Sequence, residues 1–155
     1  MTNANTDTRA GQCLCGSVKF TAHGAVKEAD ACHCSMCRRQ TGGGAYYAVQ
    51  FVGDVTIDQG KTLAWYAGSE WGERGFCSAC GTAVAWRLKA FPNKLGVSLG
   101  ALDDTSGIKL DAHIFTDSGP DYYNIPTDAP HKTGEQVMVE FMERQQRAAQ
   151  KEQSK

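Results

Sequence analysis

Residues 32–37 read Cys-His-Cys-Ser-Met-Cys and place three thiols within six positions of a 155-residue chain. The other four cysteines form two pairs, Cys13 with Cys15 and Cys77 with Cys80, so no cysteine lies outside a cluster. Disulfides between such near neighbours are strained or redox-active, because the two Cβ atoms seldom meet at the required geometry. The clustering therefore favours metal binding by thiolates, with redox-active dithiols and inert core cysteines as the alternatives.

Seven thiols divide naturally into a group of four and a group of three, since a closed structural zinc takes four tetrahedral ligands. The three central cysteines can converge from one short loop. That leaves the two outer pairs for a four-thiolate site that joins distant segments, at Cys13, Cys15, Cys77 and Cys80. A four-thiolate site built from Cys32 and Cys37 with Cys77 and Cys80 would also satisfy the count.

Three thiolate ligands and an open fourth position are typical of a catalytic zinc, which we expect at Cys32, Cys34 and Cys37. With three thiolates the formal charge on Zn²⁺ becomes 2 − 3 = −1, which weakens its Lewis acidity compared with a three-histidine site. Such a metal is better suited to hold a substrate thiol as a reactive thiolate than to generate hydroxide. The alternatives are a second closed zinc site with His33 or His113 as fourth ligand, and a triad that is empty or redox-labile.

The composition excludes several other classes of protein. Lys and Arg number 16 against 17 Asp and Glu, a net charge of −1, so no basic surface for nucleic acid is expected. No apolar run approaches the roughly 18 residues of a membrane span, and the first twenty residues lack the apolar core of a secretion signal. A hydrophobic content of 41% is too high for a disordered chain. We therefore expect a cytoplasmic protein that binds neither membrane nor nucleic acid.

The hydrophobic pattern is that of a β-rich domain. Apolar and polar residues alternate over 16–22, as in a half-buried strand. Further short strands, separated by glycine-containing turns, are expected over 45–52, 55–58, 62–66, 83–88 and 95–101. No span before residue 130 shows a helical stripe.

A helix is predicted only near the end of the chain. Apolar residues recur at helical spacing behind Thr133, and Thr133 with Gln136 fits a capping box, so the helix should cover about 134–149. The domain organisation expected is a disordered tail over 1–10, a single zinc domain over 11–150 and a charged tail over 151–155. Its fold class is mainly β, with short antiparallel strands and a C-terminal helix.

Five motifs resemble those of the glutathione-dependent formaldehyde-activating (GFA) family, whose domain is also called the centromere protein V/GFA domain. They are Gly11-Gln12-Cys13-Leu14-Cys15-Gly16, Cys32-His33-Cys34-Ser35-Met36-Cys37-Arg38-Arg39, Phe76-Cys77-Ser78-Ala79-Cys80-Gly81, Gly100-Ala101-Leu102-Asp103-Asp104 and His113-Ile114-Phe115. The resemblance spans roughly residues 11–126 with all seven cysteines in place, which makes it far more specific than one C-x-x-C motif.

This resemblance implies a β-tent fold, carbon–sulfur lyase activity and two zinc ions per chain. It implies a structural zinc at the positions of Cys13, Cys15, Cys77 and Cys80, and a catalytic zinc at those of Cys32, Cys34 and Cys37. The reference reaction of the family joins glutathione to formaldehyde and gives S-hydroxymethylglutathione.

Three further residues are candidates for substrate binding. Arg38 and Arg39 follow the triad and could hold a carboxylate of glutathione, although either could simply face solvent or balance thiolate charge. His113 could donate a proton to the nascent adduct, or be a structural histidine bonded to backbone.

The activity we expect is a zinc-dependent carbon–sulfur lyase that forms or cleaves an adduct between a small aldehyde and a thiol, with glutathione as the expected thiol. A non-catalytic zinc-binding scaffold or chaperone is the first rival. A thiol redox or metal-buffer protein is the second.

Overall fold

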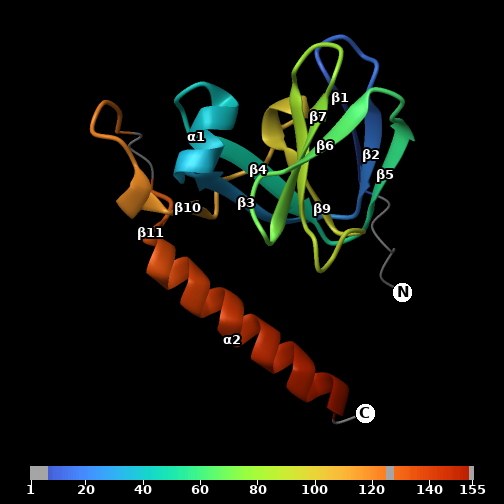
Figure 1. The fold of residues 1–155 in the computed structure, drawn as a ribbon. Helices are drawn as coiled ribbons and strands as arrows, with labels where there is room; N and C mark the ends of the chain where they lie inside the picture. The colour runs from blue at the N-terminus through green and yellow to red at the C-terminus, as the bar shows by residue number, and fades with distance from the viewer. Residues whose placement is uncertain (1–6, 125–127, 154–155) are drawn as a thin grey trace.

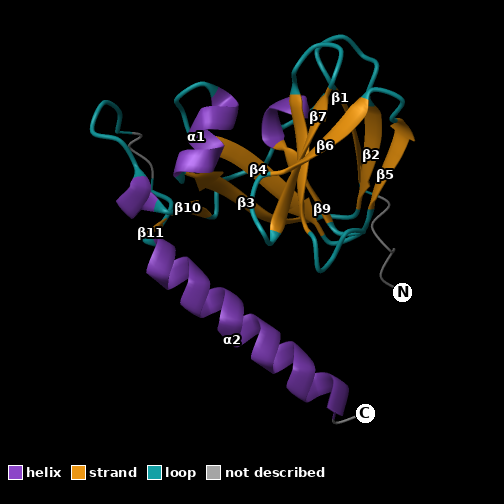
Figure 2. Ribbon diagram, in the orientation of Figure 1, coloured by secondary structure: helices purple, strands orange, loops and turns teal. Residues whose placement is uncertain are grey.

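The computed structural model describes residues 7–124 and 128–153, which form two β-sheets and two α-helices (Figures 1 and 2). The smaller sheet has the strand order β1-β2-β5, with bounds Thr8–Gln12, Lys19–His23 and Val55–Gln59. The larger sheet has the order β11-β10-β3-β4-β9-β8-β7-β6. Its strands in chain order are β3 (Val26–Cys32), β4 (Tyr46–Phe51), β6 (Leu63–Ala67), β7 (Gly72–Cys77), β8 (Ala83–Leu88), β9 (Leu95–Ser98), β10 (Ala112–Ile114) and β11 (His131–Lys132). The helices are α1 (Ser35–Thr41), α2 (Gly134–Gln153) and the 3₁₀ turns η1 (Leu99–Ala101) and η2 (Thr116–Ser118).

The mainly β fold with a C-terminal helix is confirmed, with one difference in strand direction. Within each sheet most neighbours are antiparallel, but β10 pairs in parallel with both β3 and β11. Parallel strands must be joined by a long connection, and here β10 lies about 80 residues after β3 in the chain. No local pattern in the sequence predicts this pairing.

The half-buried strand predicted over 16–22 is present but begins later, because β2 starts at Lys19 and residues 16–18 form a bend before it. Phe20 and Ala22 of β2 are buried against the core, as the alternation predicted. Gly11 of β1 lies opposite Phe20, and a Cβ at Gly11 would come within 2.3 Å of the Phe20 ring. Glycine is therefore required at position 11 by this close approach.

The core lies between the two sheets. Its buried side chains come from β2 of the smaller sheet and from β4, β8 and β9 of the larger one, including Phe20, Val49, Val84 and Val97. The thiols of Cys13 and Cys77 belong to the same buried cluster. The structure thus brings the first cysteine pair next to the last one against the hydrophobic core.

The predicted C-terminal helix is present and longer than expected. The backbone N–H of Thr133 donates to Gln136 Oε1 at 2.8 Å and the Gln136 N–H donates to Thr133 Oγ1 at 3.2 Å, which is the predicted capping box. The helix continues to Gln153, so residues 151–153 extend it rather than beginning a separate tail. Within the described residues, no helix is long and apolar enough to cross a bilayer.

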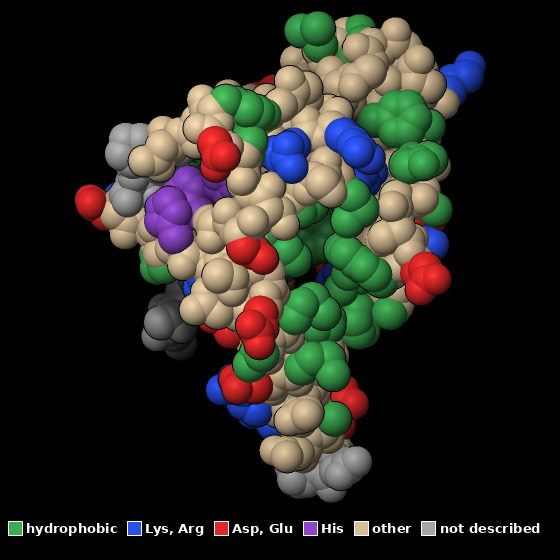
Figure 3. Space-filling model, turned by 60° about the vertical axis from the view of Figure 1, so that its left-hand side comes forward, with side chains coloured by type: hydrophobic (Ala, Val, Ile, Leu, Met, Phe, Trp, Pro, Cys, Tyr) green, Lys and Arg blue, Asp and Glu red, His purple; other side chains and the backbone are tan. Residues whose placement is uncertain are grey.

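Helix α2 stands away from the larger sheet (Figure 1). A groove of about 780 Å³ runs between them, lined by β3, β4, β8 and the inner face of α2. Hydrophobic side chains surround this hollow in Figure 3, above the helix at the bottom of the view. The ion pair between Arg144 and Glu28 bridges the groove with an N···O distance of 2.6 Å.

Two predictions about local structure are wrong. Residues 8–10 do not belong to a disordered tail, because they form β1, and Arg9 donates to the backbone oxygens of Asp104 and Ser106. Residues 1–6 of that tail lie outside the described residues. Helix α1 is not predicted by the sequence pattern, since seven residues are too few to show a stripe. It begins after Cys34, whose side chain caps it, and ends at Gly42 with φ 80°.

Candidate metal and thiol site

The four-cysteine group is built from two turns that end strands of different sheets. Cys13 and Cys15 follow β1, and Gly16 closes their turn with φ 74° by donating its N–H to the Cys13 oxygen. Cys77 ends β7 and Cys80 follows three residues later. Here Gly81, with φ 78°, donates its N–H to the Cys77 oxygen. A positive φ favours glycine, so each cysteine pair is followed by the residue that its turn requires.

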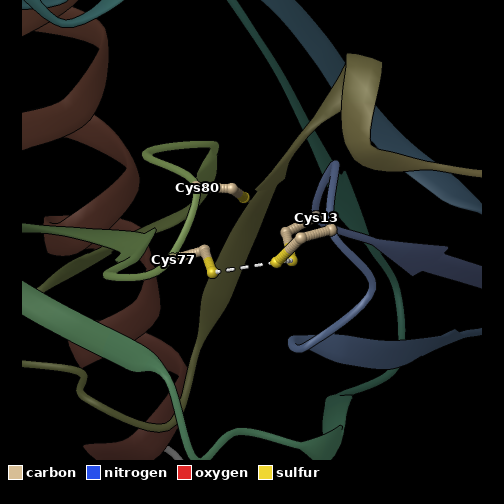
Figure 4. A group of neighbouring side chains, drawn as sticks. Cys13, Cys77 and Cys80 are labelled. Atoms are coloured by element: carbon tan, nitrogen blue, oxygen red, sulfur yellow. Dashed lines mark hydrogen bonds between the residues drawn. The ribbon is translucent and has the colours of Figure 1, made fainter.

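The four sulfur atoms are spaced as a tetrahedral zinc requires. All four lie within 4.8 Å of one another, with Sγ–Sγ distances of 3.6 Å from Cys13 to Cys15 and 3.8 Å from Cys15 to Cys77. A zinc–sulfur bond of about 2.3 Å in a tetrahedron places neighbouring sulfurs roughly 3.8 Å apart. Figure 4 shows Cys77 and Cys80 directed from one turn toward Cys13 on the other. The residues present therefore fit zinc, and the expected grouping is the one that the structure forms.

Thr82 links the two turns and was missed by sequence reasoning. Its hydroxyl accepts the N–H of Leu14 at 3.1 Å and lies 3.2 Å from the Cys80 sulfur. The hydroxyl and the backbone N–H of Thr82 lower the pKa of Cys80 to about 5. A threonine after a C-x-x-C-G sequence carries no signal of this contact, since its partner Leu14 is 68 residues away.

The second group, Cys32, Cys34 and Cys37, lies where β3 leads into α1. Cys32 is the last residue of β3, Cys34 caps α1 by accepting the N–H of Cys37, and Cys37 is buried on the first turn of the helix. The three sulfurs lie within 4.8 Å of one another. A strand that ends directly at a helix cap thus gathers three thiols from six residues.

Neighbouring groups shift the pKa values of Cys34 and Cys32 in opposite directions. Hydrogen bonds from the thiols of Cys32 and Cys37, together with nearby backbone N–H groups, hold the pKa of Cys34 far below the ordinary thiol value. The hydrogen bond with Cys34 raises the pKa of Cys32, and burial adds to this effect. The arrangement favours a thiolate at Cys34, the form in which sulfur binds metals.

His33 points away from the triad, because successive residues of an extended segment face opposite sides. Its Nε2 lies 2.9 Å from Nδ1 of His113 and its Nδ1 lies 2.7 Å from the hydroxyl of Tyr123. Burial lowers the pKa of His33 and of His113, which favours the neutral form of both imidazoles. Among the described residues, no histidine or carboxylate joins the three thiols in one ligand group.

The three candidate substrate residues occupy different places. The Nε of Arg38 donates to the backbone oxygen of His33 at 3.2 Å, so Arg38 lies against the triad loop, whereas Arg39 is exposed. His113 is fully buried and stacks on His131 with ring centroids 4.5 Å apart. His33, His113 and His131 line a cavity of about 220 Å³, and no cysteine lines that cavity. Histidine side chains reach the surface at the purple group in Figure 3. The structure therefore does not bring His113 together with the thiols.

Arg74 of β7 is a neighbour of the triad that sequence reasoning missed. Its Nη1 lies 3.8 Å from the Cys37 sulfur and 3.2 Å from Oε1 of Gln40. The two residues that it contacts are 37 and 34 positions away, so nothing in the sequence connects them.

A protein-family model and several known proteins are similar to this chain. The model of a family described as glutathione-dependent formaldehyde-activating enzyme matches residues 8–118. An uncharacterized lyase of Schizosaccharomyces pombe is 25% identical over 128 residues, covering 83% of this chain and 93% of that protein. A protein of Halomonas elongata, provisionally named a glutathione-dependent formaldehyde-activating enzyme, is 28% identical over 125 residues, covering 74% of this chain and 79% of its own. A crystal structure of a Rhodobacter sphaeroides protein aligns with a TM-score of 0.47 at 22% identity, covering 79% of this chain and 98% of that one.

Proposed function

Because this chain belongs to the glutathione-dependent formaldehyde-activating enzyme family, we propose that it is a zinc-dependent carbon–sulfur lyase. The substrates proposed are a thiol and a small aldehyde, with glutathione and formaldehyde as the first pair to test. The lyase and formaldehyde-activating names of two relatives support the class of reaction.

The observation that carries the proposal is that the triad offers three ligands and no fourth among the residues that the structure describes. Cys32, Cys34 and Cys37 supply three sulfurs, while both ring nitrogens of the nearby His33 are engaged by His113 and Tyr123. A site with three protein ligands leaves one position for a substrate, as catalytic zinc sites do. Zinc bound there would supply a soft Lewis acid on which a substrate sulfur is held as thiolate.

The reaction itself is an addition without oxidation or reduction. The thiol sulfur attacks the carbonyl carbon, a carbon–sulfur bond forms, and the π electrons of the carbonyl move to its oxygen. That oxygen receives the proton that the thiol has lost, so atoms and charge balance. Cleavage of the adduct is the same step in reverse.

The chain's own residues would position the thiol for this step. The triad fixes the place of the sulfur, because Cys34 is held by the cap of α1 and Cys32 by the end of β3. Arg38, bonded through Nε to the His33 oxygen, keeps its other guanidinium N–H groups for a carboxylate such as those of glutathione. Arg39 could add a second cationic contact from its exposed position.

A structural role is proposed for the four-cysteine group. Its ligands come in pairs from turns 62 residues apart, so a metal there would join β1 to β7 and leave no position for a substrate. Both centres need reduced thiols, which agrees with the cytoplasm as the proposed location.

The test is exchange between ¹³C-formaldehyde and its glutathione adduct, followed by NMR, because the adduct also forms without a catalyst. The parent protein should accelerate the exchange. Cys34→Ser should abolish the acceleration and lower bound zinc from about two ions to about one, in line with a lost ligand at a three-ligand site. Ser35→Ala, at the exposed neighbouring position, should change neither. Full acceleration by Cys34→Ser would contradict the assignment, and a reversible triad disulfide without catalysis would favour the redox rival.

A further inference from the structure

Arg74 is a half-buried cation whose described contacts are a thiol and an amide. Its guanidinium reaches Cys37 and Gln40, and it makes no ion pair with a carboxylate in the part of the chain that the structure describes. The neighbouring Arg87 behaves differently, since its Nε donates to Glu73 at 2.7 Å and its guanidinium lies over the Trp65 ring. Arg74 therefore has the triad as its anionic partner once the thiols are ionised.

We infer that Arg74 is a positioning residue that stabilises metal binding at the open three-cysteine site by donating an N–H to the Cys37 thiolate. The inference rests on the proposed function, because it assumes a metal held by Cys32, Cys34 and Cys37. The inference concerns how tightly that site binds metal and how its negative charge is stabilised. It does not concern the reaction of the substrate.

Local geometry places the guanidinium at the sulfur. Cys37 and Gln40 are three residues apart on α1, so their side chains lie on one face of that helix. Arg74 extends from β7 to that face, and the Gln40 carbonyl oxygen accepts from the same Nη1 that approaches Cys37. A Cβ at Gly68 would come within 3.2 Å of Arg74 Nε, so the absence of a side chain there leaves room for the guanidinium.

Charge explains why this contact matters. Three thiolates and Zn²⁺ carry a net charge of 2 − 3 = −1, and Cys37 is buried, so water stabilises that charge poorly. A hydrogen bond from a cation to a ligand atom lowers this cost and orients the ligand. Loss of such partners around metal ligands typically costs 10- to 100-fold in metal affinity.

The four-cysteine group provides a comparison within the same chain. Its sulfurs contact neutral groups, including the hydroxyls of Ser17, Thr62 and Thr82 and the N–H of Val18. Four protein ligands close that site without a cationic donor among these contacts. Removal of Arg74 should therefore weaken one site and leave the other unchanged.

A simpler role for Arg74 would be to tie α1 to β7, and a lysine distinguishes the two roles. Lysine keeps the positive charge near Cys37 but cannot reproduce the planar guanidinium that contacts sulfur and amide together. Charge stabilisation predicts partial recovery of metal affinity in Arg74→Lys compared with the similarly sized but neutral Arg74→Met. If Arg74 served only to hold α1 against β7, Arg74→Lys and Arg74→Met should lose metal affinity equally.

The experiment is competition for zinc between a chromophoric chelator and the full chain, for the parent, Arg74→Met, Arg74→Lys and the control Arg87→Met. We expect the three-cysteine site to lose about 10- to 100-fold in zinc affinity in Arg74→Met and less in Arg74→Lys. The four-cysteine group should keep its zinc affinity in every variant. An unchanged affinity at this group also shows that each variant is folded. Arg87→Met, which removes a cation that contacts no cysteine, should leave both affinities unchanged.

Other results would overturn the inference. Unchanged affinity in Arg74→Met would contradict it while leaving the proposed function in place, and so would equal losses in Arg74→Met and Arg74→Lys. A parent chain that binds no second zinc would overturn both the inference and the proposed function. Equal weakening of the two sites would show a general loss of structure and would also reject a specific role for Arg74.

Discussion

Removing both thiols of the first turn, as Cys13→Ser/Cys15→Ser, should release β1 from β7. The two turns meet through the four-cysteine group, in which Cys77 lies 62 positions after Cys15. A cross-link that closes a loop of this length restricts the unfolded chain by about 4 kcal/mol at 25 °C in the loop-entropy treatment. This is a large part of the roughly 5–15 kcal/mol that stabilises a typical domain.

The assay is thermal and urea unfolding of the zinc-loaded proteins under reducing conditions. A loss of about 4 kcal/mol corresponds to a fall in Tm of about 8–16 °C for a chain of this size. Leu14→Ser is the matched control, because Leu14 lies between the two ligands and its side chain is 88% exposed. It should leave the Tm close to that of the parent.

Zinc removal offers an independent check on the same magnitude. A chelator strong enough to empty the four-cysteine site should lower the Tm of the parent to nearly that of Cys13→Ser/Cys15→Ser, and should have a much smaller effect on the variant. A double variant that unfolds within about 1 kcal/mol of the zinc-loaded parent would contradict this role of the site, since metal would then not be what joins the two turns.

Two further predictions concern pH and the C-terminal helix. Burial, with added repulsion from Glu28 and Asp111, raises the pKa of Asp30 from 3.8 to about 6. The folded state therefore binds more protons than the unfolded state between these values, so this carboxyl destabilises the fold increasingly as the pH rises from about 4 to 6. Asp30→Asn should raise the Tm at pH 7.5 and lose this advantage near pH 4. Thr133→Ala removes the cap of α2 and should cost about 1 kcal/mol of helix stability, measured as faster amide exchange in its first turns.

Each of these predictions has a conservative control. Asp103→Asn, at an exposed position, should show little difference from the parent across the same pH range. An Asp30→Asn variant that is no more stable than the parent at pH 7.5 would contradict the assigned cost of burial. Thr133→Ser keeps the hydroxyl and should preserve slow exchange, whereas normal exchange in Thr133→Ala would show that the capping box contributes nothing.

The features best predicted from sequence are those with a local physical cause. The alternation around Phe20 follows from one buried face of a strand, and the capping box at Thr133 needs only residues three apart. Metal-ligand spacing is similarly local, since turns closed by Gly16 and Gly81 already bring each cysteine pair together. The spacing of the cysteines therefore favours these two groups, although it also allowed a four-thiolate site from Cys32 and Cys37 with Cys77 and Cys80, which the structure does not form.

The features that sequence reasoning missed depend on contacts between distant segments or on small residues. β3 buries only Ala29 and Ala31, which give a weak strand signal, although this strand lies inside the larger sheet. Its parallel partner β10 comes from far along the chain. Arg74 and Thr82 act across separations of 37 and 68 residues, so only the folded arrangement shows that they contact the two centres.

Each chain is proposed to hold one closed and one open zinc centre. The most direct measurement is zinc per chain by elemental analysis, for the parent and for Cys34→Ser, both purified under reducing conditions and loaded with zinc. One four-ligand and one three-ligand zinc site should give about two ions in the parent and about one in Cys34→Ser. A zinc-loaded parent with one ion or none would contradict this proposal.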